Sequence, residues 1–142
     1  MPTTQYPQHE ALNPFFALIM KGLENFVDGD HYFDIIADDA EFEFLYRFPG
    51  WPEKIHGRKD VIAVYSGYGN NIKVHKCDNL VVHYDKKHSV VVLEYQVHGK
   101  ILRTGAAYEN RFVSIVTIKN RKIIQWRDYM DSLAAWQALN SN

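Results

Sequence analysis

The clearest structural pattern lies in the segment Lys122-Ile123-Ile124-Gln125-Trp126-Arg127-Asp128-Tyr129-Met130-Asp131. Side chains along a strand alternate between its two faces, so Asp128 shares one face with Trp126 and Met130. The stretch therefore predicts a strand over 122–130. A short helix over 132–139 follows, and Asp131 stands where an N-cap is expected. In this arrangement Asp128 is a carboxyl group among apolar neighbours.

The residues before this strand predict a meander of three more strands, over 78–84, 89–97 and about 101–118. Short polar connections suited to hairpins join the strands at 85–87, 98–100 and 119–121. Nearer the N-terminus, aromatic residues recur with a period of two, which predicts another strand that begins at Ala40. These residues are Phe42, Phe44, Tyr46 and Phe48.

Three helices are predicted in the N-terminal half. Asn13 and Pro14 are suited to the N-cap and first turn of an amphipathic helix that continues to the turn at 28–30. A short helix is expected over 31–37, and a third follows Gly57 and ends at 67–69. Residues 1–12 have little hydrophobic pattern and predict a flexible lead-in. We expect the C-terminal helix to pack Leu133 and Trp136 on the body.

These elements predict an α+β fold in one domain, residues 13–142. A strongly curved antiparallel sheet would form a cone, with the three helices of the N-terminal half packed in its concave face. A hollow lined by both helices and strands predicts a pocket for a small-molecule ligand. The outer face carries apolar residues that a two-fold homodimer through the sheet would bury. They are predicted to be Val82, Tyr84, Val91, Leu93, Val113 and Ile115.

Composition and charge argue against several classes of partner. Sixteen Lys and Arg nearly balance 17 Asp and Glu, and the charges are scattered, so we expect no nucleic-acid partner. No apolar run approaches the roughly 20 residues of a membrane helix. The single Cys77 and the polar N-terminus predict a cytoplasmic protein. No Cys or His spacing suits a metal, and we expect neither metal nor cofactor.

Four segments resemble the SnoaL-like branch of the nuclear transport factor 2 superfamily, which includes polyketide cyclases and ketosteroid isomerases. The segments are Ala37–Ala40, Ile55–Arg58, Tyr108–Phe112 and Lys122–Asp131. The resemblance covers nearly the whole chain. It implies a cystatin-like roll, a small-molecule pocket and dimers formed through the sheet.

The resemblance also implies a role for Asp128. Trp126-Arg127-Asp128-Tyr129 is similar to the strand that bears a catalytic Asp in limonene-epoxide hydrolase, and phenazine-biosynthesis proteins have a Glu at this position. The hydrolase also uses an Arg and a second Asp, and their places are taken here by Tyr95 and Val97. Ketosteroid isomerase has its base where this chain has Phe44. Neither of these two reactions is therefore carried over.

Chemistry at Asp128 also follows from its apolar surroundings. Desolvation raises the pKa of a carboxyl group, which makes it a general base or acid near neutral pH. The alternative is a structural Asp that accepts hydrogen bonds from helix-end amides or a tyrosine hydroxyl. We predict substrate-binding roles for Phe44, Tyr46, His56, Tyr65, Tyr108, Asn110 and Trp126. The alternatives are core or pocket wall for the aromatic residues and a surface loop for His56.

The function predicted from these residues is a cofactor-free enzyme of isomerase, cyclase or hydratase type. Its substrate would be small, largely apolar, and cyclic or carbonyl-bearing, with Asp128 moving the proton. A second hypothesis is a non-catalytic protein that binds a hydrophobic metabolite in the same pocket. A third is a protein-interaction domain, which predicts a closed pocket and an exposed apolar patch.

Overall fold

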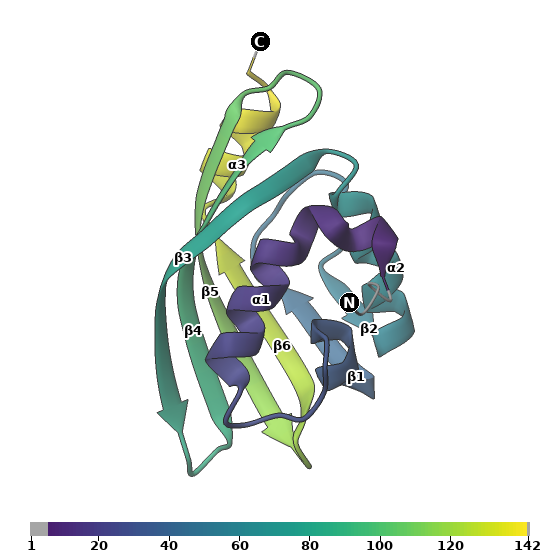
Figure 1. The fold of residues 1–142 in the computed structure, drawn as a ribbon, viewed down its shortest axis with the longest axis vertical. Helices are drawn as coiled ribbons and strands as arrows, with labels where there is room; N and C mark the ends of the chain where they lie inside the picture. The colour runs from purple at the N-terminus through teal and green to yellow at the C-terminus, as the bar shows by residue number, and fades with distance from the viewer. Residues whose placement is uncertain (1–5, 142) are drawn as a thin grey trace.

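The computed structural model describes residues 6–141, apart from the side chain of Gln8. Within these residues, two 3-10 helices, three α-helices and six strands follow one another (Figure 1). They are η1 (Pro7–Leu12), α1 (Asn13–Leu23), η2 (Tyr32–Ile35), β1 (Ile36–Phe44), β2 (Lys54–His56), α2 (Arg58–Tyr68), β3 (Ile72–Asp85), β4 (Val90–Ile101), β5 (Ala107–Lys119), β6 (Lys122–Met130) and α3 (Ser132–Leu139).

The strands form one curved sheet in the order β2-β1-β6-β5-β4-β3. The sheet is open, with β2 and β3 as its edges. The predicted α+β fold is confirmed, with one difference in strand direction: β1 pairs with β6 in parallel, whereas the other pairs are antiparallel. Irregular pairing interrupts the β1–β6, β3–β4 and β5–β6 ladders. Such bulges bend and twist strands, which explains the curvature.

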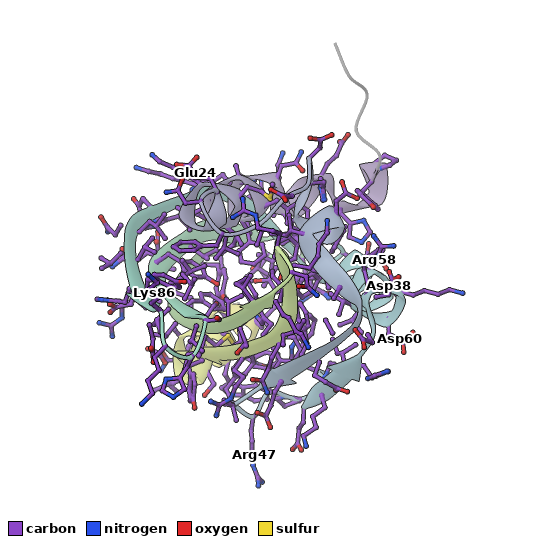
Figure 2. The ribbon with its side chains drawn as sticks, turned by 90° about the horizontal axis from the view of Figure 1, so that it is seen from below. Glu24, Asp38, Arg47, Arg58, Asp60 and Lys86 are labelled. Atoms are coloured by element: carbon purple, nitrogen blue, oxygen red, sulfur yellow. The ribbon has the colours of Figure 1, made fainter. Side chains whose placement is uncertain are left out.

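The concave face of the sheet holds the core. Helix α1 lies across this face (Figure 1) and buries Phe16, Ile19 and Leu23. A Cβ on Gly22 would lie 2.9 Å from Cδ2 of Leu93, so the absence of a side chain lets α1 approach β4 closely. In Figure 2 the labelled charged side chains, Arg47 among them, lie at the periphery of the molecule. Within the described range 6–141, no helix is long and apolar enough to cross a membrane.

The C-terminal part of the chain agrees best with the sequence. Strand β6 and helix α3 have the predicted bounds. Asp131 is the N-cap of α3, because its carboxylate accepts a hydrogen bond of 3.1 Å from the backbone N–H of Ala134. The predicted packing of Leu133 and Trp136 on the body is only partial, because Trp136 meets Phe48 edge-on with ring centroids 6.3 Å apart, whereas Leu133 lies mostly in solvent. Leu133 and Trp136 are 61% and 47% exposed, and Ala135 is the residue that α3 buries.

Other boundaries differ from the prediction. Strand β1 begins at Ile36, so the second helix is shortened to η2, and β1 ends at Phe44, before Tyr46 and Phe48. Short polar segments were predicted as a loop or hairpin at two places where the structure has strand. Residues 54–56 form the edge strand β2, and residues 98–100 continue β4. Helix α1 ends at Leu23, and Asn13 lies inside it without capping it.

The predicted flexible lead-in needs correction over its second half. Residues 7–12 form η1, in which His9 and Leu12 are buried, and Nε2 of His9 lies 2.9 Å from the carbonyl oxygen of Ile62. Residues 1–5 lie outside the described part. The outer face also differs, because Val91 and Leu93 point into the core and are fully buried. Val82 and Tyr84 are exposed, but they pair with Leu93 and Val91 and therefore lie on the inner face too, where the ring of Tyr84 lies 4.6 Å from that of Phe26.

Candidate active site

A cavity of about 600 Å³ opens between the concave face of the sheet, α2 and α3. Its volume falls in the range of pockets that hold small organic ligands. Aromatic side chains form much of its wall: Phe15, Phe44, Tyr46, Phe48, Trp51, Tyr65, Tyr68, Tyr108 and Phe112. Of the described residues that line it, Asp128 alone has an acidic or basic side chain. The cavity is therefore apolar and aromatic, with one carboxyl group.

Asp128 is 5% exposed and sits on β6 where the sheet faces the cavity. Its Oδ1 accepts a hydrogen bond of 2.5 Å from the hydroxyl of Ser114 and one of 2.9 Å from the indole N–H of Trp126. Burial raises the pKa of Asp128 to about 7, although both hydrogen bonds favour the charged form and lower it. A carboxyl group with this pKa exchanges a proton readily near neutral pH.

Two tyrosines share the cavity with this carboxyl group. Tyr46 follows β1 and Tyr65 lies on α2, and both line the cavity. Burial raises the pKa of each hydroxyl, and the nearby negative charge of Asp128 raises it further. Both hydroxyls therefore stay protonated and can donate a hydrogen bond to a ligand oxygen.

A second polar group lies on β5. The amide nitrogen of Asn110 donates a hydrogen bond of 2.8 Å to the hydroxyl of Tyr108, which lines the cavity. The Asn110 oxygen accepts from the backbone N–H groups of Arg111 and Asp131, at 2.8 and 3.2 Å. These hydrogen bonds of Asn110 therefore link β5 to the start of α3. It lies behind the wall, whereas it was predicted to contact the ligand.

The other predicted site residues are placed as follows. Phe44 lines the cavity. Trp126 is fully buried and does not line the cavity. Its indole N–H donates a hydrogen bond to Asp128. His56 is exposed on β2, where Nδ1 lies 2.5 Å from a carboxylate oxygen of Glu41. The hydrogen bond and charge of Glu41 raise the pKa of His56, and His56 does not line the cavity. His56 is therefore a surface residue.

Sequence reasoning missed Ser114 and the part played by Tyr95. Ser114 is fully buried on β5 and pairs directly with Asp128 on β6. The hydroxyl of Tyr95 lies 2.8 Å from Ser114 Oγ. Alternation along β5 could have placed Ser114 on the inner face with Tyr108 and Phe112. Its position opposite Asp128 depends on the register between the two strands, which an irregularity shifts near Thr117.

Comparison with known proteins supports the same family. The model of the SnoaL-like domain matches residues 21–126. The uncharacterized protein YesE of Bacillus subtilis (strain 168) is 23% identical over 133 residues, which cover 94% of this chain and 87% of YesE.

Solved structures share the fold. A proposed isomerase from Bacillus subtilis matches with a TM-score of 0.75 and 21% identity, covering 99% of this chain and 98% of its own. A proposed polyketide cyclase from Pseudomonas putida KT2440 matches with a TM-score of 0.67 and 16% identity, covering 92% and 96%. The fold, the aromatic cavity and the match over most of the length agree: the chain belongs to the SnoaL-like domain family.

Proposed function

We propose that this protein is an acid–base enzyme of isomerase, cyclase or hydratase type that needs no cofactor. Its substrate is a small, largely apolar molecule that is cyclic or bears a carbonyl group. The observation that carries the proposal is Asp128, a single carboxyl group with a pKa of about 7 that faces a cavity walled mainly by aromatic rings. The likeness to a proposed isomerase and a proposed polyketide cyclase supports this type of reaction.

The chemistry follows from the placement of the groups. Above its pKa Asp128 is a carboxylate, which takes a proton from the carbon next to a substrate carbonyl. The electron pair of the broken C–H bond moves onto the carbonyl oxygen, giving an enolate. A protonated tyrosine hydroxyl, from Tyr46 or Tyr65, stabilises that oxygen by a hydrogen bond. Asp128 then returns the proton to carbon or to oxygen, which completes an isomerisation or prepares a ring closure.

The aromatic wall serves this reaction in two ways. It binds an apolar ring system by burial and by ring contacts, and it keeps water away from the carboxyl group. Phe44, for example, meets Trp51 edge-on with ring centroids 5.4 Å apart, and both rings line the cavity. Loss of water keeps the pKa of Asp128 high, so the same residues that bind substrate also prepare the base.

The test uses 2-tetralone, an uncharged two-ring ketone with exchangeable C–H groups, incubated with the protein in D₂O. We expect deuterium to enter the carbons beside the carbonyl faster than in buffer, as measured by NMR. Binding is measured in parallel by calorimetry. Exchange supports the enzyme, whereas binding at the cavity with exchange at the buffer rate contradicts it and supports the alternative below.

The alternative is a non-catalytic protein that binds a hydrophobic metabolite. One observation favours it: no described lining residue other than Asp128 has an acidic or basic side chain that could act together with it. A binder would hold the same ligands, and replacing Asp128 would change their affinity without any rate to lose.

We also propose that the protein acts in the cytoplasm as a homodimer formed through the outer face of the sheet. Two large apolar side chains on this face support the interface, Val81 at 47% and Tyr129 at 40% exposed. Strand pairing through Glu94 and Val113 places them in one row across the sheet. Sedimentation equilibrium is expected to give twice the 16.6 kDa of one chain. Substitution of Val81 and Tyr129 by Lys is expected to give monomers, and a monomeric wild type would refute the dimer.

A further inference from the structure

The two oxygens of the Asp128 carboxyl group have different surroundings. Oδ1 accepts the hydrogen bonds from Ser114 and Trp126. Within residues 6–141, no group that the structure describes makes a hydrogen bond to Oδ2, although Asp128 lines the cavity. One oxygen is thus anchored to the protein, and the other is available to a ligand.

The direction of the hydrogen bonds follows from the donor inventory. An indole N–H can only donate, so Trp126 requires Oδ1 to be an acceptor. Ser114 has a single hydroxyl proton, which it gives to the same oxygen at 2.5 Å. Ser114 Oγ must then accept from its other neighbour, the Tyr95 hydroxyl at 2.8 Å. The chain of donation therefore runs from Tyr95 to Ser114 to Asp128.

We propose that Tyr95 and Ser114 are positioning residues: they anchor Oδ1 of Asp128 so that Oδ2 is the oxygen that exchanges a proton with the ligand. In the acid form the proton sits on Oδ2, because two donors already occupy Oδ1. The assignment rests on the proposed function for its meaning in catalysis. Its structural part, which oxygen carries the proton, can be tested without a substrate.

The chain of hydrogen bonds from Tyr95 through Ser114 to Asp128 is the main polar influence on the pKa of the carboxyl group. The titratable groups near it are the phenols of Tyr32 on η2, Tyr46, Tyr65, Tyr95 and Tyr108, whose pKa values burial raises, so all are neutral. Hydrogen bonds from Ser114 and Trp126 are then the interactions that favour the carboxylate against burial. A donor from Tyr95 strengthens the Ser114 hydrogen bond by polarising its hydroxyl.

The test is infrared spectroscopy of the full-length protein labelled with ¹³C at the Asp carboxyl groups, titrated from pH 5 to pH 9. The Asp128 signal is identified by its loss in Asp128→Asn. A protonated carboxyl group whose C=O oxygen accepts two hydrogen bonds absorbs at lower frequency than one with a single hydrogen bond. We expect Ser114→Ala to raise this frequency and to raise the apparent pKa by about one pH unit. Tyr95→Phe is expected to shift both in the same direction by less.

Matched controls separate positioning from general disturbance. Ser66→Ala removes a hydroxyl that bonds to the Ala63 carbonyl on α2, and Tyr129→Phe removes one from the outer face of β6. Both are expected to leave the Asp128 signal unchanged. A wild-type frequency and pKa in Ser114→Ala would overturn the role of Ser114, and the same result in Tyr95→Phe would overturn that of Tyr95. Because no substrate is used, absence of 2-tetralone exchange counts against the proposed function alone.

Discussion

Trp126 donates a hydrogen bond of 2.9 Å to Asp128, two residues further along β6 and on the same face. The indole is fully buried, so the largest side chain that β6 contributes to the core also holds a carboxyl group in place. Unpaired burial of a carboxylate is costly, and this contact with that of Ser114 offsets part of the cost. The remainder appears as the pKa of about 7.

Keeping Asp128 lowers stability at alkaline pH. Its folded-state pKa lies above its ordinary value of 3.8, so the folded protein binds more protons than the unfolded chain between about pH 4 and pH 7. The free energy of unfolding therefore falls as the pH rises through this window and levels off above it. Asp128→Asn, which cannot ionise, is expected to be the more stable protein at pH 8, by at most about 4 kcal/mol.

Urea unfolding at pH 5 and pH 8 measures this difference. The gain in Asp128→Asn should shrink as the pH falls from 8 to 5. Asp30→Asn, a matched change at an exposed position between α1 and η2, is the control for the loss of a carboxyl group as such. An equal effect of Asp128→Asn at both pH values would show that the carboxyl group does not titrate in this window.

The charge of the cavity determines which ligands enter it. Because the described lining has a carboxyl group and no basic side chain, a ligand carboxylate would be buried without a partner. We expect 2-naphthoate to bind at least about tenfold more weakly than the uncharged 2-acetylnaphthalene at pH 8. Calorimetry measures both. The gap should narrow in Asp128→Asn, and equal affinities in the wild type would contradict the charge assignment.

Gly99 illustrates a position where only glycine fits. A Cβ there would lie 2.4 Å from the backbone oxygen of Lys73 on the neighbouring strand β3. Gly99→Ala must push the two strands apart and is expected to cost about 1–3 kcal/mol of stability. At Gly67, near the end of α2, an added Cβ would have no neighbouring atom among the described residues within 4 Å, apart from the backbone of its own helix, and so has space. Gly67→Ala should be neutral or stabilising by up to about 1 kcal/mol. Equal urea midpoints for the two variants would show that a Cβ at position 99 does not clash with the Lys73 oxygen.

The N-cap of α3 makes a further prediction, because α3 contributes Ala135 and Leu139 to the cavity wall. Asp131→Ala removes the acceptor for the Ala134 N–H and is expected to cost about 1 kcal/mol of unfolding free energy. Asp131→Asn keeps an acceptor oxygen and should lose less. Thermal denaturation of both variants checks this order, and the opposite order would show that capping is not the main role of Asp131.

Sequence patterns located the elements that bury a regular apolar stripe. The alternation around Trp126 gave the bounds of β6, and Asp131 gave the start of α3. The sequence patterns failed where pairing with neighbouring strands determines the secondary structure. His98-Gly99-Lys100 looks like a hairpin, but it lies in β4 because β3 and β5 pair with it on both sides. The edge strand β2 is only three residues long and exists through its pairing with β1.

Some residues of the candidate site follow from local sequence patterns, and others depend on the pairing of strands. Asp128, Tyr46 and Tyr65 could be predicted because each combines a polar group with an apolar stripe. His56 could not be excluded, because its ion pair with Glu41 arises from the pairing of β1 with β2. Ser114 and Tyr95 could not be assigned, because their contact with Asp128 depends on the relative register of β4, β5 and β6.

Proton transfer by Asp128 is tested by the rate of deuterium exchange into 2-tetralone in Asp128→Asn. Circular dichroism and ligand binding first establish that the variant is folded with an intact cavity. Enzyme-dependent exchange is expected to fall at least about a hundredfold, while Asp39→Asn keeps the wild-type rate. Exchange at the wild-type rate by folded Asp128→Asn would show that Asp128 does not move the proton.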